Sequence, residues 1–203
     1  MVHYRMRYGD REPYYDDTYL ISAVLDDGSG AVQQETKGDS IVEARLLAMN
    51  LIKKCIREKK YIHWAHIIKD NPQQPSDKDS NVMYDNGQFY WIPNGKYGLA
   101  VPINANGTLA SGRKALMYWL YLIGKNEEGS SKVIVARGIV EARALAIARF
   151  YKRGRSISFD TAHFGAKRTA TVGKMYFDEN GKVSWTGKDG KKALVNPMNG
   201  RLM

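Results

Sequence analysis

The sequence has little cysteine and no long apolar run. Cys55 is the only cysteine among 203 residues, so no disulfide can form within the chain, and a lone thiol is typical of reducing compartments. No segment approaches the roughly 20 mostly apolar residues that a transmembrane helix needs. Residues 1–17 carry charges throughout and contain no apolar core of a signal peptide. We therefore expect a cytoplasmic protein that has no membrane partner.

Motifs for common catalytic and cofactor sites are also missing. The chain has no Walker P-loop, no G-x-G-x-x-G segment after a strand and no C-x-x-C pair, which are the signatures of nucleotide, dinucleotide and zinc sites. His63 and His66 lie in a segment whose composition favours a strand, where their side chains would point to opposite faces. We therefore expect no metal site and no cofactor.

What the sequence does contain is one segment that occurs nearly twice. SIVEARLLAMNLIKK begins at Ser40, and GIVEARALAIARFYK begins at Gly138. In the first segment, Ser40 and Glu43 have the spacing of a capping box, which satisfies free N–H groups at a helix start. In the second, Gly138 takes the cap position and Glu141 keeps the third place after it. Apolar residues then recur at helical spacing, so each segment predicts one amphipathic helix.

The similarity continues on both sides of these helices. Upstream, residues 26–29 match residues 127–130, and each turn separates two runs with strand composition. Downstream, residues 83–96 match residues 174–191. Five Asn-Gly pairs, a strong hairpin signal, favour antiparallel strands. Each copy therefore predicts two strands, a helix, a further strand and a meander of two or three strands.

These patterns predict an α+β fold that is internally duplicated, with antiparallel sheets each packed by one main amphipathic helix. We expect a pseudo-two-fold arrangement of two similar halves in one compact body. The expected organisation is an N-terminal strand or arm at 1–18, a first copy at 19–109, a short connection at 110–116 and a second copy at 117–203.

Two matched pairs of side chains are expected to have structural roles. Trp91 and Trp185 stand at corresponding places in the two copies, which predicts core residues. Arg45 and Arg143 correspond in the same way. Because a cation in the first turns of a helix opposes the helix dipole, we expect each arginine to pair with a nearby carboxylate.

The net charge of +10 belongs almost entirely to the second copy. Residues 19–109 carry ten basic and ten acidic side chains, whereas residues 117–203 carry sixteen basic and seven acidic ones. Cations attract phosphates over long range, and exposed aromatic faces stack on unpaired bases. We therefore expect a nucleic-acid-binding surface on the second copy. Its candidate residues are Arg149, Lys152, Arg153, Arg155, Lys167, Arg168, Lys188, Lys191, Lys192, Tyr151 and Phe164.

The sequence thus favours a non-enzymatic protein that binds single-stranded DNA or RNA. The predicted order of four strands and a helix, from Gln88 through Tyr151, resembles the topology of tandem PUR repeats. That resemblance implies binding of single-stranded nucleic acid, but it is one of topology alone and assigns no residue a role.

Two other functions stay open. The same basic surface would fit an acidic protein partner, which the protein would modulate or inhibit. Alternatively, His66 and His163 stand at matched places of the two copies, and paired histidines can serve as acid and base on a phosphoester. The cations near Arg149 also have a structural explanation, because Lys and Arg in the last turn of a helix complement its dipole.

Overall fold

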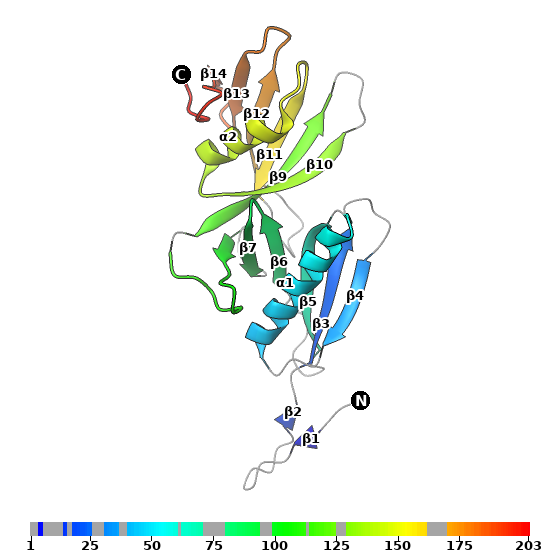
Figure 1. Cartoon of the computed structure of the whole chain (residues 1–203). Coiled ribbons are helices and arrows are strands. Elements are labelled where there is room, and N and C mark those ends of the chain that lie inside the picture. The colour runs from blue at the N-terminus through cyan, green and yellow to red at the C-terminus, as the bar shows by residue number, and fades with distance from the viewer. Residues whose placement is uncertain are drawn as a thin grey trace. The chain divides into compact units, whose positions relative to one another are not determined.

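The computed structural model of the chain has a mixed α+β fold with antiparallel strands and two helices (Figure 1). It describes residues 4–5, 14–15, 18–25, 31–36, 40–60, 62–70, 80–93, 99–112, 114–124, 129–161 and 170–203. The α+β class expected from the sequence is therefore confirmed. No helix in these ranges has both the length and the apolar character that crossing a membrane requires.

The chain divides into two compact units. The first comprises Met1–Asn94 and Pro102–Ser111, and the second comprises Gly95–Val101 and Gly112–Met203. The division assigns residues 95–101 to the second unit.

The described strands of the first unit form an antiparallel sheet in the order β4-β3-β5-β6-β7. The elements are β3 (Thr18–Leu25), β4 (Ala31–Thr36), α1 (Ile41–Arg57), β5 (Ile62–Asp70), β6 (Ser80–Asp85) and β7 (Gln88–Pro93). A separate antiparallel pair consists of β1 (Tyr4–Arg5) and β2 (Tyr14–Tyr15). Between β6 and β7, Asn86 and Gly87 have φ of 49° and 83°, the backbone of a tight hairpin turn that Asn-Gly favours.

Helix α1 begins where the sequence predicts. Ser40 is its N-cap, and the Ser40 hydroxyl accepts a hydrogen bond from the Glu43 backbone N–H at 3.3 Å. Lys54 and Arg57 stand in the last turn, where cations complement the helix dipole. The helix packs on β3 and β5 through a buried face that consists of Ala44, Arg45, Ala48, Met49, Leu51, Ile52 and Cys55.

The described strands of the second unit form an antiparallel sheet in the order β10-β9-β11-β12-β13-β14. The elements are β8 (Leu99–Pro102), β9 (Ala115–Ile123), β10 (Ser130–Ala136), α2 (Ile139–Phe150), β11 (Ser156–Thr161), β12 (Ala170–Phe177), β13 (Val183–Gly187) and β14 (Lys192–Leu194). The short strand β8 pairs with the beginning of β9. Between β11 and β12 the register shifts after Phe159, which leaves Val172 as an extra residue in the ladder.

Helix α2 has the cap that its sequence implies. Gly138 is the N-cap and offers no side chain, but a Glu141 carboxylate oxygen accepts a hydrogen bond of 2.6 Å from the Arg137 backbone N–H. The helix is shorter than α1 and ends at Phe150. Its apolar face joins one core with the sheet, which includes Leu120, Ile134, Ala142, Ala146, Ile157, Phe159, Met175, Phe177 and Trp185.

Candidate nucleic-acid interface

In each unit a buried arginine of the helix packs on a tryptophan of the sheet. The guanidinium carbon of Arg45 lies 4.3 Å from the ring centroid of Trp91, and that of Arg143 lies 5.0 Å from the centroid of Trp185. Both tryptophans are buried, which confirms their expected place in the core. The contact fixes each helix on its sheet, because a desolvated cation over an indole face is stabilising by about 2 kcal/mol.

The expected carboxylate partner of Arg143 is absent from the described residues. Arg143 Nε donates a hydrogen bond of 2.8 Å to the Gly200 carbonyl oxygen, and burial lowers the pKa of the guanidinium. The prediction is therefore wrong for Arg143, because a carbonyl dipole and an indole face take the place of a charge partner. Arg45 makes the matching contact, in which Nη1 donates to the Gly107 carbonyl oxygen at 3.5 Å.

The described candidate cations of the second unit lie at two opposite ends of its sheet. One group, exposed at the end of α2 and in the turn after it, consists of Arg149, Lys152 and Arg153. That turn is fixed to the end of β12 by a hydrogen bond of 2.8 Å from the Gly154 N–H to the Phe177 carbonyl. The other group stands at the turn after Gly187, which pairs with Gly173 near the start of β12. It consists of Lys188, Lys191 and Lys192.

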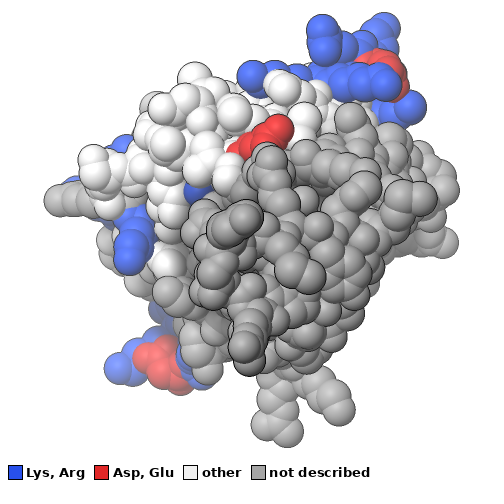
Figure 2. Space-filling view, turned by 90° about the horizontal axis from the view of Figure 1, so that it is seen from below, with Lys and Arg blue, Asp and Glu red and all other residues white. Residues whose placement is uncertain are grey.

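The structure therefore does not gather the described candidates into one cluster. In the view of Figure 2, the Lys and Arg side chains of the described residues form small clusters, and acidic side chains stand beside some of them. In the second group, for example, Lys191 Nζ lies 3.8 Å from an Asp189 carboxylate oxygen. The remaining candidates, Lys167, Arg168 and Phe164, lie outside the described residues.

Two of the candidates have structural contacts as well. Arg155 Nη1 donates a hydrogen bond of 3.0 Å to the Phe150 carbonyl oxygen, which closes the end of α2. Tyr151 packs edge-on against Phe177, with ring centroids 5.1 Å apart. These contacts support the structural explanation of the helix end for Arg155 and Tyr151.

The sheet of the second unit also has a face that α2 does not cover. Helix α2 shares its core with Tyr118, Leu120 and Leu122 of β9. Because strand side chains alternate between faces, Trp119 and Tyr121 point to the opposite side. On that side Tyr121 is 45% exposed, and Tyr176 of β12 is 39% exposed.

Strand register decides which side chains adjoin on this side. One row across β9, β11, β12, β13 and β14 consists of Tyr121, Ser158, Lys174, Thr186 and Lys192. The next row consists of Ile123, Ser156, Tyr176, Ser184 and Leu194. We call these two rows the open face. It presents aromatic rings and lysines separated by small hydroxyl side chains.

Gly129 makes room for one of these rings. A side chain at Gly129, just before β10, would overlap the hydroxyl and ring of Tyr121. The Tyr121 ring therefore lies against the backbone at the edge of the sheet, with one side accessible.

The first unit has no equivalent face among its described residues. The pair Asn81 and Ile92 in β6 and β7 takes the place of Lys174 and Thr186, and Met83 takes the place of Tyr176. All three side chains of the first unit are buried. At these positions the two units therefore differ in both polarity and exposure.

The sequence reasoning missed Tyr121 and Lys174 as site residues. It followed clusters of charge, whereas these side chains are brought together by strand register. A usable signal was present in WLYL at residues 119–122, where polar-tipped aromatic residues alternate with leucines in a strand pattern. The partner strand could not be identified from that alternation.

The alternative based on histidines stays a hypothesis. His66 lies in β5, where its backbone is opposite Ser22, but its side chain and the whole of His163 are outside the described residues. The described residues also contain no group of three His, Cys, Asp or Glu side chains placed to hold a metal ion.

No protein family, curated protein or solved structure was found to match this chain. The function must therefore be argued from the residues and their geometry.

Proposed function

We propose that the protein binds single-stranded nucleic acid on the open face of its second unit. The observation that carries the proposal is the exposure of Tyr121 and Tyr176 beside Lys174 on the side of the sheet opposite α2. Exposed aromatic rings grouped on an uncovered sheet face mark a candidate binding surface, and flat rings beside cations suit a chain of bases and phosphates.

The spacing of the rings suits an extended strand. Tyr121 and Tyr176 are two strands and two residues apart in the ladder, which corresponds to about 12 Å between their Cα atoms. Stacking on each ring is worth about 1–3 kcal/mol per base and requires an unpaired base, so it favours single strands over duplex. Lys174 and Lys192 lie in the same row as Tyr121 and would neutralise the phosphates between the bases.

The two cationic groups extend this surface at its ends. Lys152 and Arg153 stand at the end of the strands where Tyr176 lies, and Lys188 and Lys191 stand at the other end. We propose that they attract the backbone over long range and contact phosphates outside the stacked bases. The role is one of binding, without a catalytic step.

We also propose that the two units derive from one duplicated unit. Both have two strands, a helix and a meander in the same strand order, and both join a helix arginine to a sheet tryptophan. After duplication, the first unit would have buried the side on which the second unit presents Lys174 and Tyr176.

The test compares two charge reversals that change the net charge equally. Lys174→Glu alters the open face, and Lys54→Glu alters an exposed lysine of α1 in the first unit. With a labelled single-stranded oligonucleotide and fluorescence anisotropy, Lys174→Glu should weaken binding about tenfold, because it replaces a phosphate contact by a repulsion. Lys54→Glu should change the affinity by less than about threefold.

Equal losses for the two variants would contradict the proposal, since they would show only a response to net charge. If Lys152→Glu weakened oligonucleotide binding and Lys174→Glu did not, the interface would lie at the end of α2 and not on the open face. No binding by the unaltered protein at low salt would leave the acidic protein partner as the better explanation of the basic second unit.

A further inference from the structure

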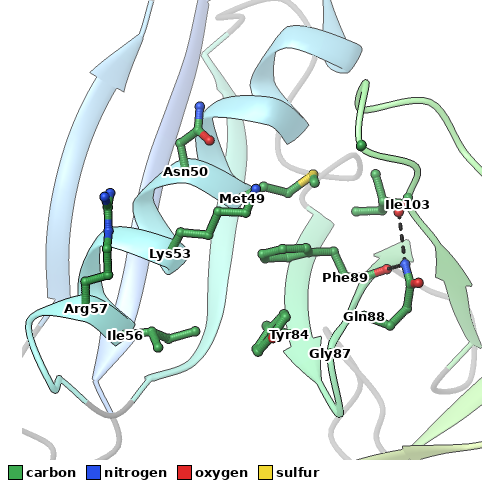
Figure 3. A pocket seen from close by; sticks show the side chains of 11 residues that line it. Met49, Asn50, Lys53, Ile56, Arg57, Tyr84, Gly87, Gln88, Phe89 and Ile103 are labelled. Atoms are coloured by element: carbon green, nitrogen blue, oxygen red, sulfur yellow. Dashed lines mark hydrogen bonds between the residues drawn. The ribbon is translucent and has the colours of Figure 1, made fainter.

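The first unit contains a pocket of about 700 Å³ between the second half of α1 and the β6–β7 hairpin (Figure 3). That volume is within the range of small-molecule sites, which are mostly apolar with a few polar groups. The apolar part of the lining consists of Met49, Ile56, Ile103, Tyr84 and Phe89. All of these residues belong to one unit, so the pocket is complete within it.

One wall of the pocket is aromatic. The rings of Tyr84 and Phe89 have centroids 4.8 Å apart and are tilted by 48°. Tyr84 is 40% exposed, although its neighbour Phe89 is buried. An accessible ring in a concave apolar site is suited to contact with another flat ring.

The charge of the pocket is positive. Lys53 Nζ lies 5.5 Å from the ring centroid of Phe89, and Figure 3 shows this side chain reaching from α1 toward that ring. Arg57 follows one turn later, where Figure 3 shows it pointing away from Phe89, so its charge stands at the rim. The lining residues include these two cations and no carboxylate.

The second unit fills the corresponding place with its own ring. Tyr151 stands eight residues after Arg143, as Lys53 stands eight residues after Arg45. Tyr151 packs against the fully buried Phe177. Phe177 corresponds to Tyr84, because Phe177 pairs with Val183 in its hairpin as Tyr84 pairs with Phe89 in the first unit. In the first unit, the residue that corresponds to Tyr151 in the sequence is Lys53, and the Tyr84 ring stays accessible. Tyr151 itself follows the end of α2, whereas Lys53 lies inside α1.

We propose that the pocket binds a nucleoside monophosphate, with the base against Tyr84 and Phe89 and the phosphate on Lys53. Both N–H groups of the Gln88 amide are engaged, to the Phe89 carbonyl at 2.8 Å and the Ile103 carbonyl at 2.9 Å. These two bonds hold the Gln88 side chain in place at the edge of the pocket. The site is independent of the proposed open face, because it uses different residues in a different unit.

The experiment is isothermal titration calorimetry of the full chain with adenosine monophosphate, adenosine and ribose 5-phosphate. Adenosine monophosphate should bind with a Kd between about 10 µM and 1 mM, and each of the other two should bind at least about fivefold more weakly. Lys53→Ala should weaken binding about tenfold, whereas Lys54→Ala, an equal charge change on the adjacent exposed residue, should have an effect below about twofold.

A second variant places a tyrosine ring in the pocket, as Tyr151 does at the corresponding place of the second unit. Lys53→Tyr should abolish binding, because a ring at this position would lie against Phe89 and occupy the pocket, and a thermal unfolding curve checks that the variant is folded. Lys174→Glu should leave the nucleotide affinity unchanged, which separates this site from the open face. The proposal is overturned by no measurable binding at about 5 mM ligand, by equal effects of Lys53→Ala and Lys54→Ala, or by ribose 5-phosphate binding as tightly as the nucleotide.

Discussion

At the scale of single residues, two glycines hold the chain end of each unit against its helix. Gly107 and Gly200 have φ of 81° and 70°, and their carbonyl oxygens accept hydrogen bonds from Arg45 and Arg143. A Cβ on Gly107 would lie 2.7 Å from the Val42 carbonyl oxygen. Glycine is required at both positions for two reasons: the positive φ of the backbone and the close approach of the helix.

Gly200→Ala should destabilise the protein by about 3 kcal/mol. The new Cβ would overlap the Val140 carbonyl oxygen and lie 2.7 Å from the Ala144 nitrogen, in addition to the strain of a positive φ. The control is Gly190→Ala, which has φ of 75° but no atom within 4 Å, so it should cost only about 1 kcal/mol. Urea unfolding followed by tryptophan fluorescence measures both. If both variants lost the same free energy of unfolding, the close approach of Gly200 to α2 would contribute nothing to stability.

At the scale of elements, the two helices have different first turns. In α1 the cap is a side chain, because the Ser40 hydroxyl accepts from the Glu43 N–H. In α2 the cap is a glycine, and the Glu141 carboxylate accepts from the Arg137 N–H instead. The α1 cap therefore satisfies one free N–H group of its helix, whereas the α2 contact satisfies the N–H of the residue before the N-cap.

Ser40→Ala should lower the free energy of unfolding by about 1 kcal/mol, because it removes the only side chain that caps the Glu43 N–H in the described structure. Ser111→Ala, at an exposed residue outside any helix or strand, serves as the control and should change it by less than about 0.5 kcal/mol. Chemical denaturation monitored by circular dichroism gives both values. If the two variants unfold alike, the cap has no measurable effect.

The elements themselves were largely predictable from the sequence. The capping residues place the starts of both helices, and AVQQET at residues 31–36 is a strand, as its composition predicts. The site was harder, because the open face depends on register across five strands and the pocket depends on how far α1 continues past the place where α2 ends. Neither the pairing partner of Tyr121 nor the exposure of Tyr84 is encoded in a local pattern.

At the scale of the whole molecule, the two units have the same strand order but present different chemistry. The second unit exposes aromatic rings and lysines on the side where the first buries Asn81, Met83 and Ile92. The first unit leaves open a pocket where the second packs Tyr151. The two units thus share the contact of a helix arginine with a sheet tryptophan and differ at the two surfaces for which we propose ligands.

The most direct test of this account is the affinity of single-stranded and duplex oligonucleotides across a range of salt concentrations. The account predicts tighter binding of the single strand, with a log–log salt slope of about −2 or steeper, which corresponds to about three phosphates. Replacing both Tyr121 and Tyr176 by alanine should remove the preference for single strands and leave that slope unchanged, because stacking carries no charge. Equal affinity for single strand and duplex, or a preference that survives loss of both rings, would contradict it.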